Sequence, residues 1–389
     1  MKTKLVAAMA LLFVTVRLAH AAEPVPTSPA PKPPPASVAA VVAAAEEAGF
    51  AGVVLSGDRS RITFEQAVGL ADRSRRTPHS VEMVWRWASV SKQITAIIAA
   101  QLVVEGKLDL DKPVSTYLNA KEFGSANAKL ITIRQLLQHT SGLPNPSDVP
   151  TAVSADDKAV PDAMPVFYLE DVAPEAVHKS AAASTCAATP KRAPGERFEY
   201  NNCDYLVLGA VIEKITGQLF ASVINERIAK PLNLQKEAVR PATIKDKYAQ
   251  PVKGYEGKRV ELTFNLATYG AAGALLGSPR DLFAIDQALL GESLMSAEAK
   301  KQFWKGEPNI GYAALGVWSF PATLKGCKEP VELIERRGAI GGVQVRNFLA
   351  PALGKVLLVL TNRGEWEFGE VWQGKGFSHD LLSATLCTN

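Results

Sequence analysis

The spacing of hydrophobic residues near the start of the chain predicts one helix and then a hairpin. Residues 38–49, VAAVVAAAEEAG, are apolar at helical intervals and end in a glycine, which commonly closes helices. Two strand-like runs follow at residues 51–56 and 62–71. Gly57 and Asp58 stand between these runs and form a dipeptide typical of tight turns. We therefore expect a helix followed by a β-hairpin.

Helical spacing returns after Ser89 and dominates the middle of the chain. The first of these runs extends to Gly106 and has four apolar positions on one face: Ile94, Ile97, Ile98 and Leu102. Residues 131–144 predict a helix that ends in a fixed loop. Two further helices are expected at 204–217 and 219–231, ended by the glycine and the proline at their last positions.

The stretch from about residue 145 to residue 193 has no such pattern. It is rich in alanine, proline and serine, and it is long for a connection between helices. A connection of this length is usually a functional flap or a locally disordered segment.

The last part of the chain predicts three strands and one helix. The strand-like runs are residues 331–338, 341–351 and 354–362, and a helix follows at 378–387. Strands at both ends with helices between them predict an α/β (α+β) fold. Its antiparallel sheet would be built from both chain ends, flanked by helices, with a mainly helical region inserted at roughly 105–270.

The first residues resemble an export signal. Lys2 and Lys4 precede the apolar run LVAAMALLFVTV, and the small residues of AHA at 19–21 form a cleavage site. We predict a signal peptide at 1–21, a proline-rich linker at 22–37 and one domain at 38–389. The expected location is secreted or periplasmic in a bacterium, with no integral membrane segment after cleavage.

Charge and cysteine content narrow the expected partners. The formal charge of +4 comes from 43 basic and 39 acidic residues, and loss of Lys2, Lys4 and Arg17 leaves 40 and 39, or +1. A nearly neutral domain does not indicate nucleic acid or an anionic membrane as a partner, so we expect a small-molecule or peptide substrate. The oligomeric state is not predicted.

Four cysteines lie in the exported part: Cys186, Cys203, Cys327 and Cys387. An oxidising compartment would allow two disulfides with three alternative pairings. Proximity in sequence favours Cys186 with Cys203 and Cys327 with Cys387. The chain has no CxxC and no Cys/His cluster, so neither a metal nor any other cofactor is expected.

Ser89 and Lys92 are the first candidates for chemistry. Motifs of α/β-hydrolases, zinc proteases and nucleotide-binding loops are absent from the sequence. Ser89 precedes a predicted helix, where free backbone amides favour an oxyanion, and Lys92 lies one turn away on the same face. A buried lysine with a lowered pKa could accept the serine proton. Serine is also a common helix cap, so the pair alone does not distinguish a catalytic site from an ordinary helix start.

The sequence segments around Ser89 and Lys92 identify a protein family more specifically than the pair itself does. In order, they are WRWASVSKQITA, LVVEGKLDLDKPVSTYL, ITIRQLLQHTSGLP, PGERFEYNNCDYLVLGAVIEKITG and AAGALLGSPRDL. Together they resemble the class C β-lactamase-related serine hydrolases and penicillin-binding proteins, from about residue 38 to the end. The resemblance implies a β-lactamase/transpeptidase-like fold.

The second motif of that family is Tyr-x-Asn. Tyr200 and Asn202 follow PGERFE and precede a predicted helix, as in the family, whereas Tyr117 and Asn119 fall in a packing segment. The resemblance implies that Tyr200 moves protons for Ser89 and the leaving group, and that Asn202 binds Lys92 and a substrate amide. His139, in QHTSGLP, is expected to fix a loop.

The third motif departs from the family, which has lysine or histidine, a small residue and glycine. Here IERRGAIGG aligns Gly338 and places Arg336 at the basic position, since strand alternation puts Arg337 on the other face. Arg336 could fork onto a carboxylate but cannot give up its proton. Gly338 would allow close approach of substrate, and the resemblance implies an oxyanion hole from the amides of Ser89 and Ala339.

The expected function is therefore an exported serine hydrolase that forms an acyl-enzyme at Ser89 on amide or ester substrates. β-Lactams, D-amino-acid peptides and esters all remain open as substrates. The departure at Arg336 keeps two alternatives: an esterase or D-amino-acid peptidase without β-lactamase activity, and a non-catalytic penicillin-recognising binding or sensor protein.

Overall fold

The computed structural model describes residues 36–148, 164–235, 237–247 and 251–387. The predicted signal peptide at 1–21 and nearly all of the linker at 22–37 lie outside these residues. So do residues 149–163, within the long stretch expected to be a functional flap or a locally disordered segment.

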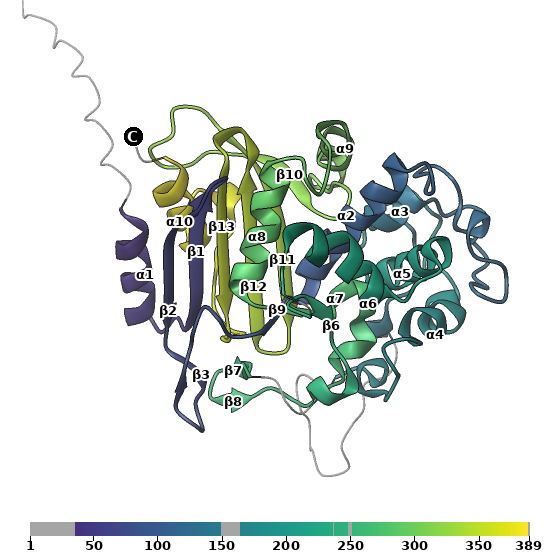
Figure 1. Ribbon diagram of the computed structural model, residues 1–389, viewed down its shortest axis with the longest axis horizontal. Helices are drawn as coiled ribbons and strands as arrows, with labels where there is room; N and C mark the ends of the chain where they lie inside the picture. The colour runs from purple at the N-terminus through teal and green to yellow at the C-terminus, as the bar shows by residue number, and fades with distance from the viewer. Residues whose placement is uncertain (1–35, 149–163, 236, 248–250, 388–389) are drawn as a thin grey trace, which may run out of the picture. The chain divides into compact units, whose positions relative to one another are not determined.

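One antiparallel six-stranded sheet organises the described residues, in the order β10-β11-β12-β13-β1-β2. The first two strands of the chain lie beside its last strand (Figure 1). The bounds are β1 (Gly52–Asp58), β2 (Ile62–Val68), β10 (Trp318–Ala322), β11 (Val331–Ile340), β12 (Val343–Ala350) and β13 (Lys355–Thr361). This arrangement confirms the predicted sheet built from both chain ends.

Helices cover both faces of the sheet. The terminal helices α1 (Val38–Glu47) and α10 (Phe377–Leu386) pack together on one face, where Val42 and Leu381 are fully buried. Helices α2 (Ser91–Val104) and α8 (Pro279–Leu290) belong to the core on the other face. Central strands covered on both faces need continuous apolar runs, which explains the sequence KVLLVLT of β13.

The chain between β2 and β10 is mainly helical, as predicted for its middle part, and its described residues also form three small sheets. Its helices besides α2 and α8 are α3 (Ile133–Leu137), α4 (Val177–Ala183), α5 (Cys203–Thr216), α6 (Phe220–Ile224), α7 (Gly270–Gly273) and α9 (Ala297–Phe303). The short strands are β3 (Leu70–Asp72), β4 (Thr77–Pro78), β5 (Trp85–Arg86), β6 (Arg240–Pro241), β7 (Tyr255–Glu256), β8 (Arg259–Val260) and β9 (Leu275–Gly277). The order β5-β9-β6 joins the segment before Ser89 to the segment before α8.

Two expectations about local structure were wrong. The hairpin turn lies after Asp58, because β1 continues through Gly57 and the Asp58 carboxylate accepts bonds from the amides of Ser60 and Arg61 at 2.9 and 3.2 Å. The stretch at 145–193 is not simply a long loop: its described part contains α4 and 3₁₀ turns at Val166–Leu169 and Thr185–Ala187.

Two further differences concern element ends. The helix predicted to stop at Pro231 continues through a 3₁₀ turn to Leu232 and ends at Asn233, which adopts a left-handed conformation. Strand β10 was not predicted, because its sequence WSFPA is short and contains a proline, which edge strands tolerate.

Both predicted disulfides are present, Cys186–Cys203 and Cys327–Cys387. In the part of the chain that the structure describes, no single helix is long and apolar enough to cross a membrane. The helices Cys203–Thr216 and Phe220–Leu232, which are bent against each other, are together long and apolar enough by length and composition only.

Candidate active site

Ser89 lies in a 3₁₀ turn, Ala88–Val90, that leads directly into α2. The preceding segment is fixed, since the Trp87 amide donates to the Leu275 carbonyl at 2.9 Å and its indole donates to Gly277 at 3.1 Å. Ala88 is buried and has φ of +47°, a conformation that is unfavourable for a residue with a side chain. Such strained residues persist where the surroundings enforce them, often beside reacting groups.

Lys92 is fully buried one turn along α2, and its ammonium group lies 3.2 Å from the Ser89 Oγ atom. It also donates to the Asn202 Oδ1 atom at 2.7 Å and to the Ala272 carbonyl at 2.8 Å. Burial lowers the pKa of Lys92 well below its usual range, and the nearby Arg336 charge lowers it further. A lysine favoured in its neutral form at this distance can accept the serine proton.

Tyr200 also contacts Ser89. Its hydroxyl donates to the Ser89 Oγ atom at 2.6 Å and accepts a bond from the Arg336 Nη2 atom at 3.0 Å. Both Ser89 and Tyr200 are only half-buried, so a substrate can reach them. Tyr117, the tyrosine of the other Tyr-x-Asn sequence, has a different role. Its hydroxyl accepts a hydrogen bond from the Asp109 amide at 2.8 Å in a turn.

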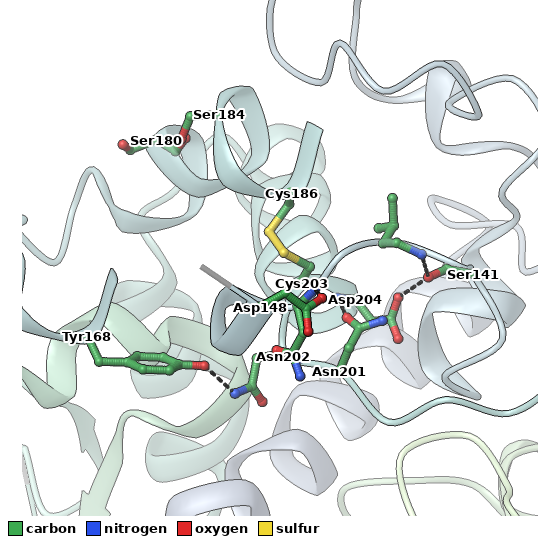
Figure 2. The surroundings of a disulfide bond; sticks show 12 residues. Ser141, Asp148, Tyr168, Ser180, Ser184, Cys186, Asn201, Asn202, Cys203 and Asp204 are labelled. Carbon is green, nitrogen blue, oxygen red and sulfur yellow. Dashed lines mark hydrogen bonds between the residues drawn. A yellow bond between two sulfur atoms is a disulfide. The ribbon is translucent and has the colours of Figure 1, made fainter. Parts of the chain in front are cut away.

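Asn202 is held at both ends of its side-chain amide. Oδ1 accepts from Lys92, and Nδ2 donates to the Tyr168 hydroxyl at 2.8 Å (Figure 2). The next residue, Cys203, is tied to Cys186 by the disulfide in the same view. Tyr168 stacks on Tyr269 with ring centres 4.0 Å apart. Sequence reasoning missed Tyr168, since it belongs to no motif and lies in the stretch expected to be a flap.

Arg336 is turned into the protein and is only 2% exposed. Its Nε atom donates to the Ser89 carbonyl at 2.9 Å, while Nη2 donates to Tyr200. Arg337 lies on the other face of β11 and pairs with Glu335 and Glu370, as strand alternation predicts. Arg336 thus connects the serine turn to the Tyr200 phenol. The expected bidentate contact of its guanidinium with a substrate carboxylate would have to compete with these two bonds.

Gly338 lets β11 approach the serine turn closely. A Cβ atom at this position would lie 2.6 Å from the Trp87 carbonyl and 3.1 Å from the Ser89 amide nitrogen. The space opened by the glycine is therefore filled by the protein's own turn, whereas the expectation was close approach by substrate. Ala339 follows with an exposed side chain. Strand β10 begins at Trp318, opposite Glu335, so among the described strands none pairs with β11 along this side from Arg336 to Ile340.

His139 and Asp204 lie behind Tyr200. The His139 Nδ1 atom is 2.9 Å from the Asp204 Oδ2 atom, and both side chains are buried. Burial raises the pKa of Asp204 well above its usual range and lowers the pKa of His139 well below its own, so both groups are favoured as neutral. The His139 carbonyl accepts the Glu199 amide at 2.8 Å, and its ring contacts Tyr200 at 4.4 Å between centres. This histidine holds the tyrosine segment in place.

Within the described ranges, no group of three or more His, Cys, Asp or Glu side chains is arranged to hold a metal ion.

Comparison with known proteins identifies the class and the family. A family model described as Beta-lactamase matches residues 38–373. Esterase EstB of Burkholderia gladioli is 28% identical over 346 residues, which cover 80% of this chain and 85% of the esterase. PbpX of Bacillus subtilis (strain 168), named as a penicillin-binding protein, is 27% identical over 290 residues, or 72% of this chain and 66% of PbpX. The chain thus spans just under two thirds of PbpX.

A solved structure agrees with these matches. The D-stereospecific amidohydrolase from Streptomyces sp. superposes with a TM-score of 0.68 at 25% identity, covering 91% of this chain and 99% of that one. The fold and these matches define the class as the serine hydrolases related to β-lactamases. The chain belongs to the Beta-lactamase family.

Proposed function

We propose that the protein hydrolyses esters or amides through a covalent acyl-enzyme on Ser89. The observation that carries this proposal is the position of the Ser89 Oγ atom, 3.2 Å from the Lys92 ammonium and 2.6 Å from the Tyr200 hydroxyl. A nucleophile within hydrogen-bond reach of two proton-handling groups is the arrangement that acyl transfer requires.

In the proposed reaction, Lys92 in its neutral form accepts the Ser89 proton while Oγ bonds to the substrate carbonyl carbon. The amides of Ser89 and Ala339 stabilise the resulting oxyanion. Tyr200 passes a proton to the leaving alcohol or amine as its bond to the carbonyl carbon breaks. Water then attacks the acyl carbon and gives a proton to the Tyr200 oxygen. The bond from the acyl carbon to the Ser89 Oγ atom breaks, and Lys92 returns its proton to Oγ as the acid leaves.

Arg336 favours substrates that carry no carboxylate. It is 2% exposed, it already donates to the Ser89 carbonyl and the Tyr200 hydroxyl, and it cannot lose its proton. A substrate carboxylate would have to draw this guanidinium away from both oxygens. We therefore propose uncharged esters and amides as the substrate class, rather than β-lactams or D-alanyl peptides. The similarity to an esterase and to a D-stereospecific amidohydrolase supports this choice.

The test compares four substrates with one purified sample: a p-nitrophenyl ester, a D-amino-acid amide, a chromogenic cephalosporin and a D-Ala-D-Ala peptide. We expect kcat/KM for the better of the two substrates without a carboxylate to exceed that for the carboxylate-bearing ones by at least about 100-fold. Equal or faster turnover of the cephalosporin would contradict the substrate class. No Ser89-dependent turnover of any substrate would favour a binding protein instead.

We also propose that the protein acts after export from the cell interior. The predicted signal peptide motivates this, and the two disulfides are typical of oxidising compartments. Fractionation of bacteria that produce the full chain should recover it in the periplasm or the medium, without its first residues. Recovery of the uncleaved chain inside the cell would contradict the proposal.

A further inference from the structure

A hollow lies beside β11, the strand that carries Arg336. It has a volume of about 420 Å³, within the usual range for small-molecule sites, and its walls are mainly aromatic. The apolar residues that line it are Tyr312, Trp318, Phe320, Pro321 and Trp372. They come from the segment before β10, from β10 itself and from the short turn Val371–Gln373.

The exposure of these aromatic residues is unusual. Trp372 is 62% exposed and Tyr312 is 38% exposed, and they are the only aromatic side chains among the exposed large hydrophobic residues of the described ranges. Both converge on the same hollow. Tyr312 also has φ of +63°, which is strained for an aromatic residue. Exposed aromatic rings that gather at one cavity mark a binding site more often than a structural need.

The charges beneath the hollow balance one another. Arg337 pairs with both Glu335 and Glu370, and its guanidinium lies 5.1 Å from the centre of the Trp372 ring. Glu335 and Arg337 are the two charged residues that line the hollow. Because they pair with each other, they leave no net charge to attract an ion. The occupant should therefore be uncharged.

Trp318 connects the hollow to the catalytic groups. Its ring centre lies 5.0 Å from the guanidinium carbon of Arg336, which donates to the Tyr200 hydroxyl and to the Ser89 carbonyl. Phe198, two residues before Tyr200, lies 6.4 Å from the same ring. The hollow lies on the Arg337 face of β11, and among the described strands none pairs with the edge of β11 from Arg336 onward. A substrate group held at Ser89 would therefore reach the hollow around this edge, past Arg336 and Trp318.

We propose that this hollow binds an uncharged apolar group, an alkyl chain or aromatic ring, of the same substrate whose carbonyl reacts at Ser89. This inference rests on the proposed ester or amide hydrolysis and specifies its substrates. An apolar group that leaves water for an aromatic wall gains free energy in proportion to the area it buries. Selectivity should therefore increase with the length of the apolar group once that group reaches past Arg336.

The test is a series of p-nitrophenyl esters from acetate to octanoate, measured with the wild-type protein and with Trp372→Ala. In the wild type, kcat/KM should rise by up to about fourfold for each methylene that enters the hollow. Trp372→Ala should lower kcat/KM for octanoate by at least about tenfold while acetate is little affected. Trp372 is mostly exposed, so its removal should leave the fold intact.

Two further variants sharpen the comparison. Tyr312→Asn removes the second ring with a residue that tolerates positive φ, and it should also flatten the chain-length series. Leu219→Ala, an exposed apolar residue that does not line the hollow, should leave the series unchanged. A parallel series of acetate esters with alcohols of increasing length shows whether the acyl or the leaving group occupies the hollow.

The outcomes separate the two proposals. Suppose that acetate is hydrolysed and that kcat/KM depends on chain length in the same way in the wild type and in Trp372→Ala, in both ester series. This result would overturn the hollow as a substrate site and leave the hydrolase proposal standing. Absence of Ser89-dependent turnover for every ester would overturn both. Self-association that Trp372→Ala abolishes, with no change in the ester series, would identify a protein interface and overturn the inference.

Discussion

At the scale of single residues, the site separates groups that can exchange a proton from a group that cannot. Lys92 is buried, has a lowered pKa and lies near Ser89, whereas Arg336 keeps its charge and orients its neighbours. Placing a permanent cation near Lys92 helps to keep the lysine neutral. Arginine at the third motif is therefore compatible with acylation chemistry although it replaces the family's lysine or histidine.

This separation predicts the pH dependence of activity. A lysine that accepts a proton must be neutral, so kcat/KM should rise with pH through the lowered pKa of Lys92, well below the usual 10.5. Arg336→Met removes one cause of the lowering and should move this acid limb to higher pH. The measurement is the pH profile of ester hydrolysis for both proteins. An acid limb in the ordinary lysine range in the wild type would contradict the role of Lys92.

The contact at Gly338 predicts a stability effect. Gly338→Ala would force a Cβ atom to within 2.6 Å of the Trp87 carbonyl, so the free energy of unfolding should fall by about 1–3 kcal/mol. Activity should fall as well, because the strand and the serine turn must move apart. Gly291→Ala is the control, since its nearest neighbour lies 3.6 Å away and its φ is −94°. Denaturant unfolding of the two variants makes the comparison, and equal losses would contradict it.

The sequence predicted which residue types meet at the site better than it predicted what each one contacts. Spacing placed Lys92 one turn from Ser89, and strand alternation placed Arg336 and Arg337 on opposite faces. It could not show that Arg336 would bond to the Ser89 carbonyl, because that contact joins residues 247 positions apart. For the same reason Tyr168, the partner of Asn202, was not found.

At the scale of elements, one disulfide supports the site and the other does not. Cys186–Cys203 ties a 3₁₀ turn to the first residue of α5, directly after Asn202 (Figure 2). Cys327–Cys387 joins the loop after β10 to the end of α10, among residues packed on the opposite face of the sheet. The two bonds close segments of different length, with separations of 17 and 60 residues.

Removal of each disulfide should therefore affect stability and activity in opposite order. Loop entropy predicts a loss of about 3 kcal/mol for the Cys186→Ala/Cys203→Ala pair and about 4 kcal/mol for Cys327→Ala/Cys387→Ala. Activity per folded molecule should fall more in the first pair, because Asn202 loses its anchor. Unfolding curves rank the two double variants by loss of stability. Values of kcat/KM, measured at a temperature where both are folded, rank them by loss of activity. Unchanged activity in the first pair would refute the link to Asn202.

The element boundaries show where sequence patterns were insufficient. Gly57 and Asp58 form a dipeptide typical of turns, yet β1 continues through both because its apolar residues pair with β13. Long-range pairing overrode the local turn signal. The strands β11, β12 and β13 were predictable because each contains strand-forming apolar residues and is bounded by glycine, proline or asparagine.

At the scale of the whole molecule, a buried polar cluster joins the helical region to the sheet. Asp286 of α8 accepts bonds from Gln93 of α2 at 2.9 Å and from Asn347 of β12 at 3.1 Å. Burial raises the pKa of Asp286 to about 7, although both amides oppose the change. Gln93 follows Lys92 directly, so this cluster also supports the helix that carries the catalytic lysine.

The raised pKa of Asp286 predicts a pH effect on stability. Between its usual pKa of 3.8 and about 7, the folded state binds the proton more tightly than the unfolded state does. The contribution of Asp286 to stability is therefore present at acid pH and is lost as pH rises toward 7, by roughly 4 kcal/mol in total. Asp286→Asn cannot ionise, so its Tm relative to wild type should be higher at pH 8 than at pH 5. Equal Tm differences at the two pH values would contradict this account.

The overall architecture was predictable because strands at both ends of the chain and helices between them allow few arrangements. The sheet built from both chain ends is confirmed, and so is the disulfide pairing, which proximity in sequence had favoured. The aromatic hollow was not predictable, since Tyr312, Trp318 and Trp372 are single residues in unrelated segments that only the folded chain brings together.

The most direct test of the central claim is the mass of the intact protein during reaction with a p-nitrophenyl ester. We predict a transient mass increase equal to one acyl group, located by peptide mapping on Ser89, which is absent in Ser89→Ala. Lys92→Met should fold but accumulate little of this species. Hydrolysis of the ester by Ser89→Ala at the wild-type rate, or acylation at another residue, would contradict the acyl-enzyme mechanism.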